Sequence, residues 1–325
     1  MNDQKLTSGE LVAIQGDLGS NHHLLLTQML PGAGVLGCKS FKELFEAVVN
    51  QVSLGQKSQK PAATLGLLAI ENSIAGSILG NFDLLSSYPV KVIAEGYLRI
   101  EHCLIGLPGS NLAQIKRAYS HEMALKQCDQ YLSDNNLEPV EYFDTAAAVK
   151  HIVELGDPSC VAIAPAIAAG IYGGELLQRG IETNKQNYTR FLLIAPLEGS
   201  SVETSSVDAN NMDESDGQKA VFQDPISATK VMLELELKHE VGSLAKVLKL
   251  IVDLGYNLTK IESRPIIGTA WKYKFYLDFE VDQSVEADLS KGLAQLEGAC
   301  SSLKVLGHFP SGRTYDTVTN DNLTK

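Results

Sequence analysis

The sequence lacks a hydrophobic run long enough to cross a bilayer, which takes about 18–20 consecutive apolar residues. Its longest apolar stretch, residues 160–174, is shorter and contains Pro165. The first ten residues have neither an apolar core nor a small-residue cleavage pattern, so we expect no signal peptide. These absences favour a cytoplasmic protein and disfavour one that is exported or embedded in a membrane.

Positive charge and paired cysteines are scarce as well. The chain has 27 Lys and Arg against 39 Asp and Glu, a net charge of −12, with no basic cluster. Such a chain is poorly suited to binding nucleic acid or an anionic membrane. The five cysteines form no Cys-x-x-Cys pair, which favours reduced, buried thiols. A nucleophilic cysteine stays open as an alternative.

The acidic residues are unevenly spread. Residues 198–224 hold seven Asp and Glu and one Lys, so they carry −6 of the −12. This stretch has no hydrophobic periodicity and is rich in Ser, Asp, Glu and Asn, which predicts a flexible linker over residues 198–228. With 44% hydrophobic residues, the 325-residue chain is long enough for two or three domains, each with its own core.

Short apolar runs alternate with helical patterns before the linker, which predicts an α/β body with largely parallel sheets. The predicted strands are residues 11–15, 65–70, 90–94, 103–107, 116–119, 140–143, 160–164 and 191–195. The predicted helices are residues 20–30, 41–52, 123–132 and 146–155. After the linker, residues 229–310 predict the order βαββαβ, and residues 311–325 predict a polar, frayed tail.

Two patterns that suggest a cofactor or a metal are weak. Residues 32–37 match the glycines of a dinucleotide fingerprint, but a helix and Pro31 precede them instead of a strand, so we interpret them as a turn before a short strand. His22 and His23 are adjacent, but no carboxylate or cysteine stands at ligand spacing from them. We therefore predict no cofactor and no metal.

Polar residues directly follow several predicted strands, and the carboxyl ends of parallel strands share the edge where α/β sheets bind ligands. The segments are residues 16–20, 71–73, 120–121 and 144–145. The first is a glycine turn at a helix start, where backbone N–H groups can hold a carboxylate or phosphate. The alternative is that Ser20, Ser73 and the polar residues of the last two segments only cap helices.

Residues 187–191, Asn-Tyr-Thr-Arg-Phe, precede the predicted strand 191–195. Thr189 offers a hydroxyl donor, and Arg190 offers a planar fork that suits a carboxylate. Phe191 can pack on a ring. The alternative is an ordinary start of a strand with an arginine on the surface.

Together these motifs resemble the prephenate dehydratase family with a C-terminal ACT regulatory domain. The order and spacing match over roughly residues 11–310, apart from the linker. The matching segments are Gln15-Gly16-Asp17-Leu18-Gly19, Glu71-Asn72-Ser73 with Gly76-Ser77, Ser120-His121 with Ala124-Leu125-Lys126-Gln127-Cys128, Asp144-Thr145-Ala146, Asn187 to Phe191, Gly242-Ser243-Leu244 and Glu262-Ser263-Arg264-Pro265. Where the family usually continues its glycine turn with an aromatic residue and a Ser or Thr, this chain has Asn21 and His22.

The resemblance implies decarboxylating dehydration of prephenate to phenylpyruvate in phenylalanine biosynthesis, without a cofactor. It implies that Thr189 acts on the departing hydroxyl, and that Glu71 is an acid or orients Arg190. The substrate-binding residues that it implies are Gly19, Ser20, His22, Asn72, Ser73, Ser120, His121, Thr145, Arg190 and Phe191. The implied catalytic body, residues 10–197, is similar to periplasmic binding proteins, with one lobe at about 10–95 and 178–197 and the other at about 96–177.

For residues 229–310 the resemblance implies a phenylalanine sensor whose copies pair side by side in a homodimer or homotetramer. The implied phenylalanine-binding residues are Gly242, Ser243, Leu244, Asn257, Leu258, Glu262, Ser263, Arg264 and Pro265. A signal cannot travel through a floppy linker, so we expect direct contact between domains or between subunits. The alternatives are an arogenate dehydratase, a non-catalytic amino-acid sensor on the same two-lobed body, and an amino-acid-regulated oxidoreductase, which the weak dinucleotide pattern disfavours.

Overall fold

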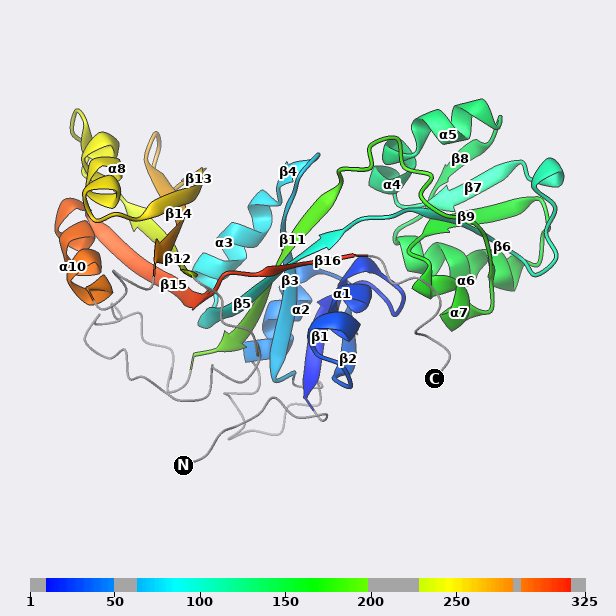
Figure 1. Ribbon diagram of the computed structural model, residues 1–325, viewed down its shortest axis with the longest axis horizontal. Helices are drawn as coiled ribbons and strands as arrows, with labels where there is room; N and C mark the ends of the chain where they lie inside the picture. Colours follow the sequence, from blue (N-terminus) through cyan, green and yellow to red (C-terminus); the bar gives the residue numbers. More distant parts are fainter. Residues whose placement is uncertain (1–9, 50–62, 198–227, 283–287, 317–325) are drawn as a thin grey trace.

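The computed structural model describes residues 10–49, 63–197, 228–282 and 288–316. The predicted linker therefore lies almost wholly outside the described residues. The described part is elongated (Figure 1), with a small second sheet at one end, a C-terminal α+β unit at the other, and the first sheet between them.

The first sheet mixes parallel and antiparallel strands. Its strands are β1 (Leu11–Gln15), β2 (Gly34–Cys38), β3 (Leu65–Asn72), β5 (Val90–Arg99) and β11 (Tyr188–Pro196), with β4 (Gly76–Ser77) on the margin of β3. Strand β1 lies parallel to β2 and β3, whereas β11 runs antiparallel between β3 and β5. One apolar layer of the sheet packs with α1 (Asn21–Met29), and the other packs with α2 (Phe41–Val49) and α3 (Leu79–Ser87).

The second sheet has the order β10-β6-β9-β7-β8 and is also mixed. Its elements are β6 (Cys103–Gly106), the short helix η1 (Leu112–Gln114), β7 (Arg117–Ser120), α4 (Glu122–Gln127), α5 (Asp129–Asp134), β8 (Glu138–Glu141), α6 (Thr145–Leu155), β9 (Cys160–Ala164), α7 (Ile167–Tyr172) and β10 (Glu175–Gln178). The prediction of an α/β body is confirmed, but "largely parallel" is wrong. The chain crosses to the second sheet after β5 and returns along β11, so these two long neighbours must run in opposite directions.

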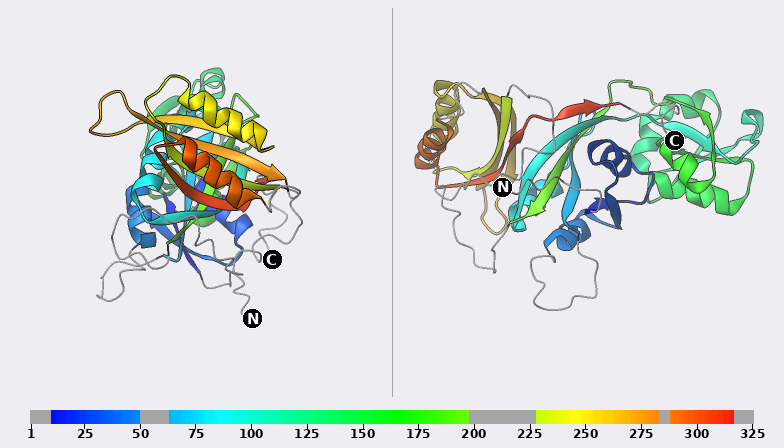
Figure 2. Two further views of the ribbon diagram at one scale, coloured as in Figure 1. Left: turned by 90° about the vertical axis from the view of Figure 1, so that its left-hand side faces the viewer. Right: turned by 60° about the horizontal axis from the view of Figure 1, so that its bottom comes forward.

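The C-terminal unit has the predicted element order βαββαβ. Its elements are β12 (Ala228–Glu236), α8 (Ser243–Asp253), β13 (Asn257–Pro265), β14 (Tyr273–Asp282), α10 (Leu289–Ala299) and β15 (Ser302–Pro310). Strand β15 meets β5 where Gly307 is opposite Val92, so this sheet continues the first sheet edge to edge. Figure 2 shows α8 and α10 on the outer face. The inner face packs on α3, where the Tyr276 hydroxyl donates to the Phe82 carbonyl at 3.0 Å. The expected direct contact between domains is present.

The prediction of a frayed tail is wrong for residues 313–315, which form a strand. Strand β16 (Arg313–Tyr315) pairs in parallel with β5, and the backbone N–H of Gly312 donates to Glu95 at 3.0 Å. The open edge of β5 beyond β15 offers unpaired backbone groups, which this segment satisfies. Residues 317–325 lie outside the described residues.

Several smaller predictions are confirmed. The glycine-rich segment forms the predicted turn at residues 31–32 and then strand β2, Gly34–Cys38. All five cysteines are buried and free, and burial raises the pKa of Cys38 to about 11, which keeps its thiol protonated and weakly nucleophilic. Among the helices of the described residues, none is both long and apolar enough to cross a membrane.

Candidate active site

A cavity of about 200 Å³ lies between the two sheets of the N-terminal body. Both sheets contribute to its wall, and it is lined by Gln15, Ser20, Asn21, His22, Ala69, His121, Phe143, Asp144, Thr145, Thr189 and Phe191. Six of the predicted site residues therefore meet there: Ser20, His22, His121, Thr145, Thr189 and Phe191. Gln15, Ala69 and Phe143 were not predicted as site residues: Gln15 begins the matched segment Gln15 to Gly19 but was given no role, and Ala69 and Phe143 belong to no matched motif.

The hydroxyl of Thr189 has a fixed hydrogen-bond role. Asn72 Oδ1 accepts from the backbone N–H groups of Ile74 and Ala75 at 3.0 and 2.9 Å, which orients its amide. Asn72 Nδ2 therefore faces Thr189 and donates to Oγ1 at 3.0 Å. Because a hydroxyl has a single proton, Thr189 accepts from Asn72 and keeps its own proton to donate toward a ligand in the cavity.

Asn72 belongs to a chain of polar side chains that joins the two lobes. Its Nδ2 also donates to Asn187 Oδ1 at 2.7 Å, and Asn187 Nδ2 donates to Gln127 Oε1 at 3.0 Å. Gln127 Oε1 lies 2.7 Å from His102 Nε2, so His102 is the donor. Gln127 on α4 was not predicted as a site residue, although it stands in the segment Ala124 to Cys128, which is part of the motifs that resemble the family. This series of hydrogen-bonded side chains fixes the position of Asn72, and through it that of Thr189, relative to the second sheet.

Two helices begin at the cavity. Ser20 caps α1 by accepting from the N–H of His23, and Asp144 caps α6 by accepting from the N–H of Ala147 at 2.9 Å. The first N–H groups of a helix lack intrahelical partners and carry partial positive charge, which favours an anion. Burial raises the pKa of Asp144. Asp144 is thus both the cap that the sequence predicted and part of the site.

The glycine turn before α1 lets the lobes approach closely. Gly16 and Gly19 have φ of +93° and +91°, a region that residues with a side chain rarely adopt. A Cβ on Gly16 would come within 2.9 Å of Asp144 Oδ2, and a Cβ on Gly19 would come within 3.0 Å of the Ala168 Cβ. Gly19 therefore acts through backbone conformation and close approach, and it is not among the residues that line the cavity.

His22 is a buried, neutral wall of the cavity. Its ring lies edge-on to Phe191 at a centroid distance of 4.9 Å and 5.9 Å from Phe41, and its Nε2 has no hydrogen-bond partner among the described residues. Burial lowers the pKa of His22 to about 3. Its neighbour His23 accepts from the N–H of Gly19 at 3.0 Å. No group of three His, Cys, Asp or Glu that could hold a metal occurs within the described ranges.

His22→Asn is expected to reduce the acid sensitivity of folding. The folded-state pKa lies below the unfolded value of about 6.5, so the unfolded chain binds more protons between these values and stability falls as the pH drops through that window. Between pH 7 and pH 5 His22 should account for a loss of about 2 kcal/mol. Urea unfolding at both pH values should show a smaller difference for the variant. An equal difference in both proteins would contradict a buried neutral imidazole.

Two predicted residues lie beside the cavity with structural hydrogen bonds. Ser120 is fully buried and donates to the Ile163 carbonyl at 2.6 Å. Ser73 Oγ donates to the Gln186 carbonyl and accepts from the N–H of Tyr188. Neither lines the cavity, and both connect neighbouring segments of the site.

Glu71 and Arg190 point away from the cavity. The predicted motif lies inside β11 instead of before it, and successive side chains of a strand face opposite sides of its sheet. Thr189 and Phe191 therefore face the cavity, whereas Arg190 binds Glu95 and Asp278 on the other face. Glu71 likewise reaches Lys260 of β13 at 3.0 Å. The expectation that Arg190 reaches a ligand in this cavity does not agree with this geometry.

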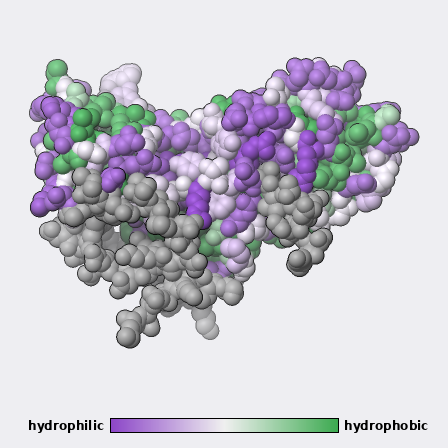
Figure 3. Space-filling view, viewed as in Figure 1, coloured by the Kyte–Doolittle hydropathy of each residue, from purple (hydrophilic) through white to green (hydrophobic). Residues whose placement is uncertain are grey.

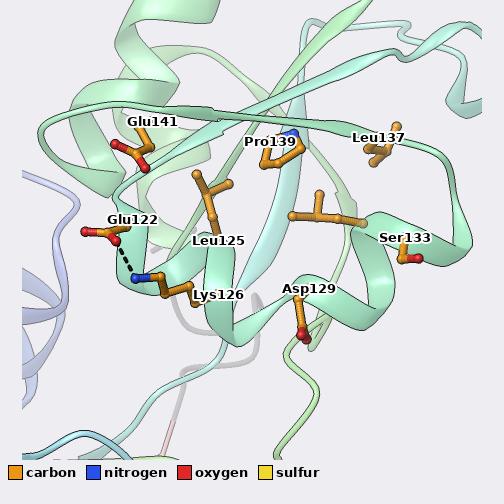
Figure 4. Close-up of a pocket in the computed structure, with 9 residues that line it drawn as sticks. Glu122, Leu125, Lys126, Asp129, Ser133, Leu137, Pro139 and Glu141 are labelled. Atoms are coloured by element: carbon orange, nitrogen blue, oxygen red, sulfur yellow. Dashed lines mark hydrogen bonds and ion pairs between the residues drawn. The ribbon is translucent and has the colours of Figure 1, made fainter.

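A larger cavity of about 390 Å³ lies on the second lobe, between α4, α5 and β8 (Figure 4). Its floor is apolar, with Leu125, Leu132 and Leu137. Glu122, Asp129 and Glu141 stand at its margin, and its one cation, Lys126, is paired with Glu122. The groove therefore does not suit an anionic ligand and takes no part in the site.

The residues predicted to bind phenylalanine fall into two groups. Gly242, Ser243 and Leu244 line a cavity of about 530 Å³ together with Trp271 and Tyr273. The other six, Asn257, Leu258, Glu262, Ser263, Arg264 and Pro265, lie along β13 and do not line it. Arg264 donates to Asp83 of α3, and Asn257 donates to Glu280 at 3.3 Å.

The chain is similar to several known proteins. A model of the family described as prephenate dehydratase matches residues 12–198. A Komagataeibacter europaeus protein named bifunctional N-acyl-homoserine lactone acylase/prephenate dehydratase is 29% identical over 301 residues, which cover 93% of this chain and 96% of that one. Arogenate dehydratase/prephenate dehydratase 6, chloroplastic, of Arabidopsis thaliana is 32% identical over 323 residues, which cover 93% and 69%.

The fold is also that of a solved structure. Prephenate dehydratase from Arthrobacter aurescens in complex with L-Phe superposes with a TM-score of 0.72 at 24% identity, over 92% of this chain and 89% of that one. At this identity the likeness concerns the fold. Because the family match covers more than half of the chain, and the Arabidopsis relative exceeds 30% identity over two thirds of its own length, the chain belongs to the prephenate dehydratase family.

Proposed function

We propose that the protein converts prephenate to phenylpyruvate by decarboxylating dehydration in the cytoplasm and is feedback-regulated by phenylalanine. The observation that carries the proposal is the Thr189 hydroxyl, which accepts from Asn72 and keeps its proton for a ligand in the cavity. Loss of CO₂ and water makes the prephenate ring aromatic, so the reaction is strongly downhill. The enzyme must mainly orient the substrate and assist departure of the ring hydroxyl.

In the proposed arrangement Thr189 donates to the departing hydroxyl as negative charge develops on its oxygen. No Lys or Arg is among the residues that line the cavity, so the starts of α1 and α6 hold the two substrate carboxylates. Phe191 packs on the ring. His22, neutral and buried, stands where the family usually has a Ser or Thr and contacts the substrate as an uncharged group.

Asn72→Asp is expected to lower kcat nearly as much as loss of the Thr189 hydroxyl. A carboxylate accepts hydrogen bonds only, so it would draw the Thr189 proton away from the substrate, with KM changed less than kcat. The matched control is Ser73→Ala, which removes a hydroxyl that bonds to backbone groups outside the cavity. Steady-state kinetics with prephenate measures both. Normal kcat in folded Asn72→Asp would refute the assigned direction of this hydrogen bond.

We also propose that the C-terminal unit is an ACT domain that binds phenylalanine and pairs with a second copy. Supporting this, β13 pairs with β14 alone among the described strands, which leaves one sheet edge open to another chain. Large hydrophobic side chains are exposed on this unit: Val241, Val252, Ile267 and Trp271. Figure 3 shows hydrophobic residues exposed among hydrophilic ones at this end of the molecule. Such patches mark interfaces or ligand sites, and the solved relative with this fold holds L-Phe.

The test is to incubate the purified chain with prephenate and with arogenate separately, with and without phenylalanine. We expect phenylpyruvate from prephenate, and less of it when phenylalanine is added. Faster turnover of arogenate would identify an arogenate dehydratase. No turnover of either, with phenylalanine bound, would favour a non-catalytic sensor. An arm with an N-acyl-homoserine lactone tests the second activity in the name of the Komagataeibacter relative.

A further inference from the structure

Two residue pairs face each other across β3 and β11 and point to opposite faces of the sheet. Thr189, which lines the cavity, is opposite Asn72 and accepts a hydrogen bond from it. Arg190 is opposite Glu71, and both of these reach the C-terminal unit. Thr189 and Asn72 form the hydrogen bond that orients the Thr189 hydroxyl. Each of them is next in sequence to a charged residue, Arg190 or Glu71, that is ion-paired to the C-terminal unit.

The contact of Arg190 is almost completely shielded from water. Its side chain is 6% exposed, and those of Glu95 and Asp278 are fully buried. Arg190 Nε donates to Glu95 Oε2 at 2.7 Å, and Nη1 donates to Asp278 Oδ2. Glu95 lies on β5, beside β11, whereas Asp278 lies on β14 of the C-terminal unit. The guanidinium therefore bridges the strand of Thr189 to the other unit.

Lys230 of β12 completes this buried cluster. Its ammonium group lies 2.8 Å from Glu95 Oε1 and donates to the Tyr97 hydroxyl at 3.0 Å. The carboxylates of Glu95 and Asp278 balance the positive charges of Arg190 and Lys230, so the four side chains have no net charge. Burial alone would raise the pKa of Glu95, but Arg190 and Lys230 hold that pKa below its usual value. Asp278 Oδ1 has no hydrogen-bond partner among the described atoms, so Asp278 is held mainly by Arg190.

We propose that Arg190 is a positioning residue that transmits the state of the C-terminal unit to Thr189, through its ion pair with Asp278. Glu71, bound to Lys260, does the same for Asn72. For its enzymatic readout the proposal rests on the proposed function. Displacement of β14 would leave Arg190 as a partly unpaired buried cation, which is strongly unfavourable. Strand β11 must then shift with β14, and the Thr189 hydroxyl moves with it.

Other contacts between the two units lack this connection. Arg264 pairs with Asp83 on α3, with side chains 23% and 29% exposed, and Lys274 donates to Ser86 at 2.7 Å. Neither touches β11. The Asp83–Arg264 pair therefore serves as a comparison. Like Asp278–Arg190 it is an ion pair of Asp and Arg that joins the two units, but it does not touch β11, the strand that holds Thr189.

The experiment compares Asp278→Asn with Asp83→Asn in the full-length chain. Asn has the shape of Asp and removes only the charge. For each variant, kcat, KM for prephenate and the phenylalanine concentration for half-inhibition are measured. Hydrogen exchange of the β11 amides, with and without phenylalanine, is measured in parallel and needs no activity. Arg190→Lys, which keeps the charge but loses the planar fork, is the second variant.

We expect Asp278→Asn and Arg190→Lys to lower kcat more than they change KM, and to raise the half-inhibition concentration at least about five-fold. Their β11 amides should exchange faster than those of the wild type. Asp83→Asn should match the wild type in both respects. Wild-type exchange and wild-type inhibition in both cluster variants would overturn the proposal. If the wild type does not turn over prephenate, the proposed function fails. The coupling between Asp278 and β11 is then judged from the exchange of the β11 amides alone.

Discussion

Thr189→Val is expected to lower kcat for prephenate by about 10²–10⁴-fold, the contribution typical of a positioned proton donor. Valine has the shape of threonine and keeps the packing beside Phe191, but it has no hydroxyl. Asn72 would keep its bond to Asn187 at 2.7 Å, so the surrounding network should persist. KM should change little, because the lost interaction develops mainly as the ring hydroxyl departs.

Thr189→Ser is the control for this result, since serine retains the hydroxyl and loses only a methyl group. Its kcat should stay far closer to the wild-type value than that of the valine variant. Initial rates of phenylpyruvate formation measure all three proteins, and thermal unfolding checks that each is folded. If folded Thr189→Val turned prephenate over at a near-normal rate, Thr189 would have no part in the mechanism.

The predicted secondary structure was most reliable where an apolar pattern was bounded by polar residues. Strands 11–15 and 160–164 were predicted at their observed limits. Strand β11, by contrast, starts at Tyr188, three residues before the predicted strand. The polar residues Thr189 and Arg190 interrupt the hydrophobic signal, although the backbone continues to pair with β3 and β5.

This boundary decided how the candidate site was interpreted. Outside a strand, Thr189, Arg190 and Phe191 could all turn to one ligand. Inside a strand they alternate, and Arg190 faces the C-terminal unit. The attraction of Arg190 to Asp278 links positions 88 residues apart in the chain, and no local pattern carries such information. The same alternation applies to Glu71, since β3 extends to Asn72 and Glu71 pairs with Lys260 of the C-terminal unit.

Four of the predicted cavity residues, Ser20, His22, His121 and Thr145, stand at the caps or first residues of helices, where local chemistry is informative. Gln127 was missed because its role depends on Asn187, which folding brings to it from 60 residues away. Helix 123–132 was predicted as one element, but it breaks at Cys128 into α4 and α5. Periodicity alone did not distinguish two short helices from one.

Glu95→Ala is expected to destabilise the fold by about 3–5 kcal/mol, the range for removing one partner of a buried ion pair. Glu95 is fully buried and binds Arg190, Lys230 and the N–H of Gly312. Alanine would leave Arg190 with Asp278 alone, and Lys230 with the Tyr97 hydroxyl and a distant carboxylate of Glu280 at 4.0 Å. The free energy of unfolding in urea at pH 7 measures the loss.

The matched control is Asp253→Ala, which removes the 51% exposed partner of Lys249 on α8. An exposed pair of this kind contributes about 0–1 kcal/mol. The pH dependence gives a second check. The pKa of Glu95 is lowered in the folded state, so its contribution is present above its unfolded pKa of about 4.5 and is lost as the pH falls through the folded value. The difference between wild type and Glu95→Ala should therefore stay constant above about pH 5 and shrink in acid. A loss no greater than that of the control would mean that the cluster does not stabilise the contact between the first sheet and the C-terminal unit.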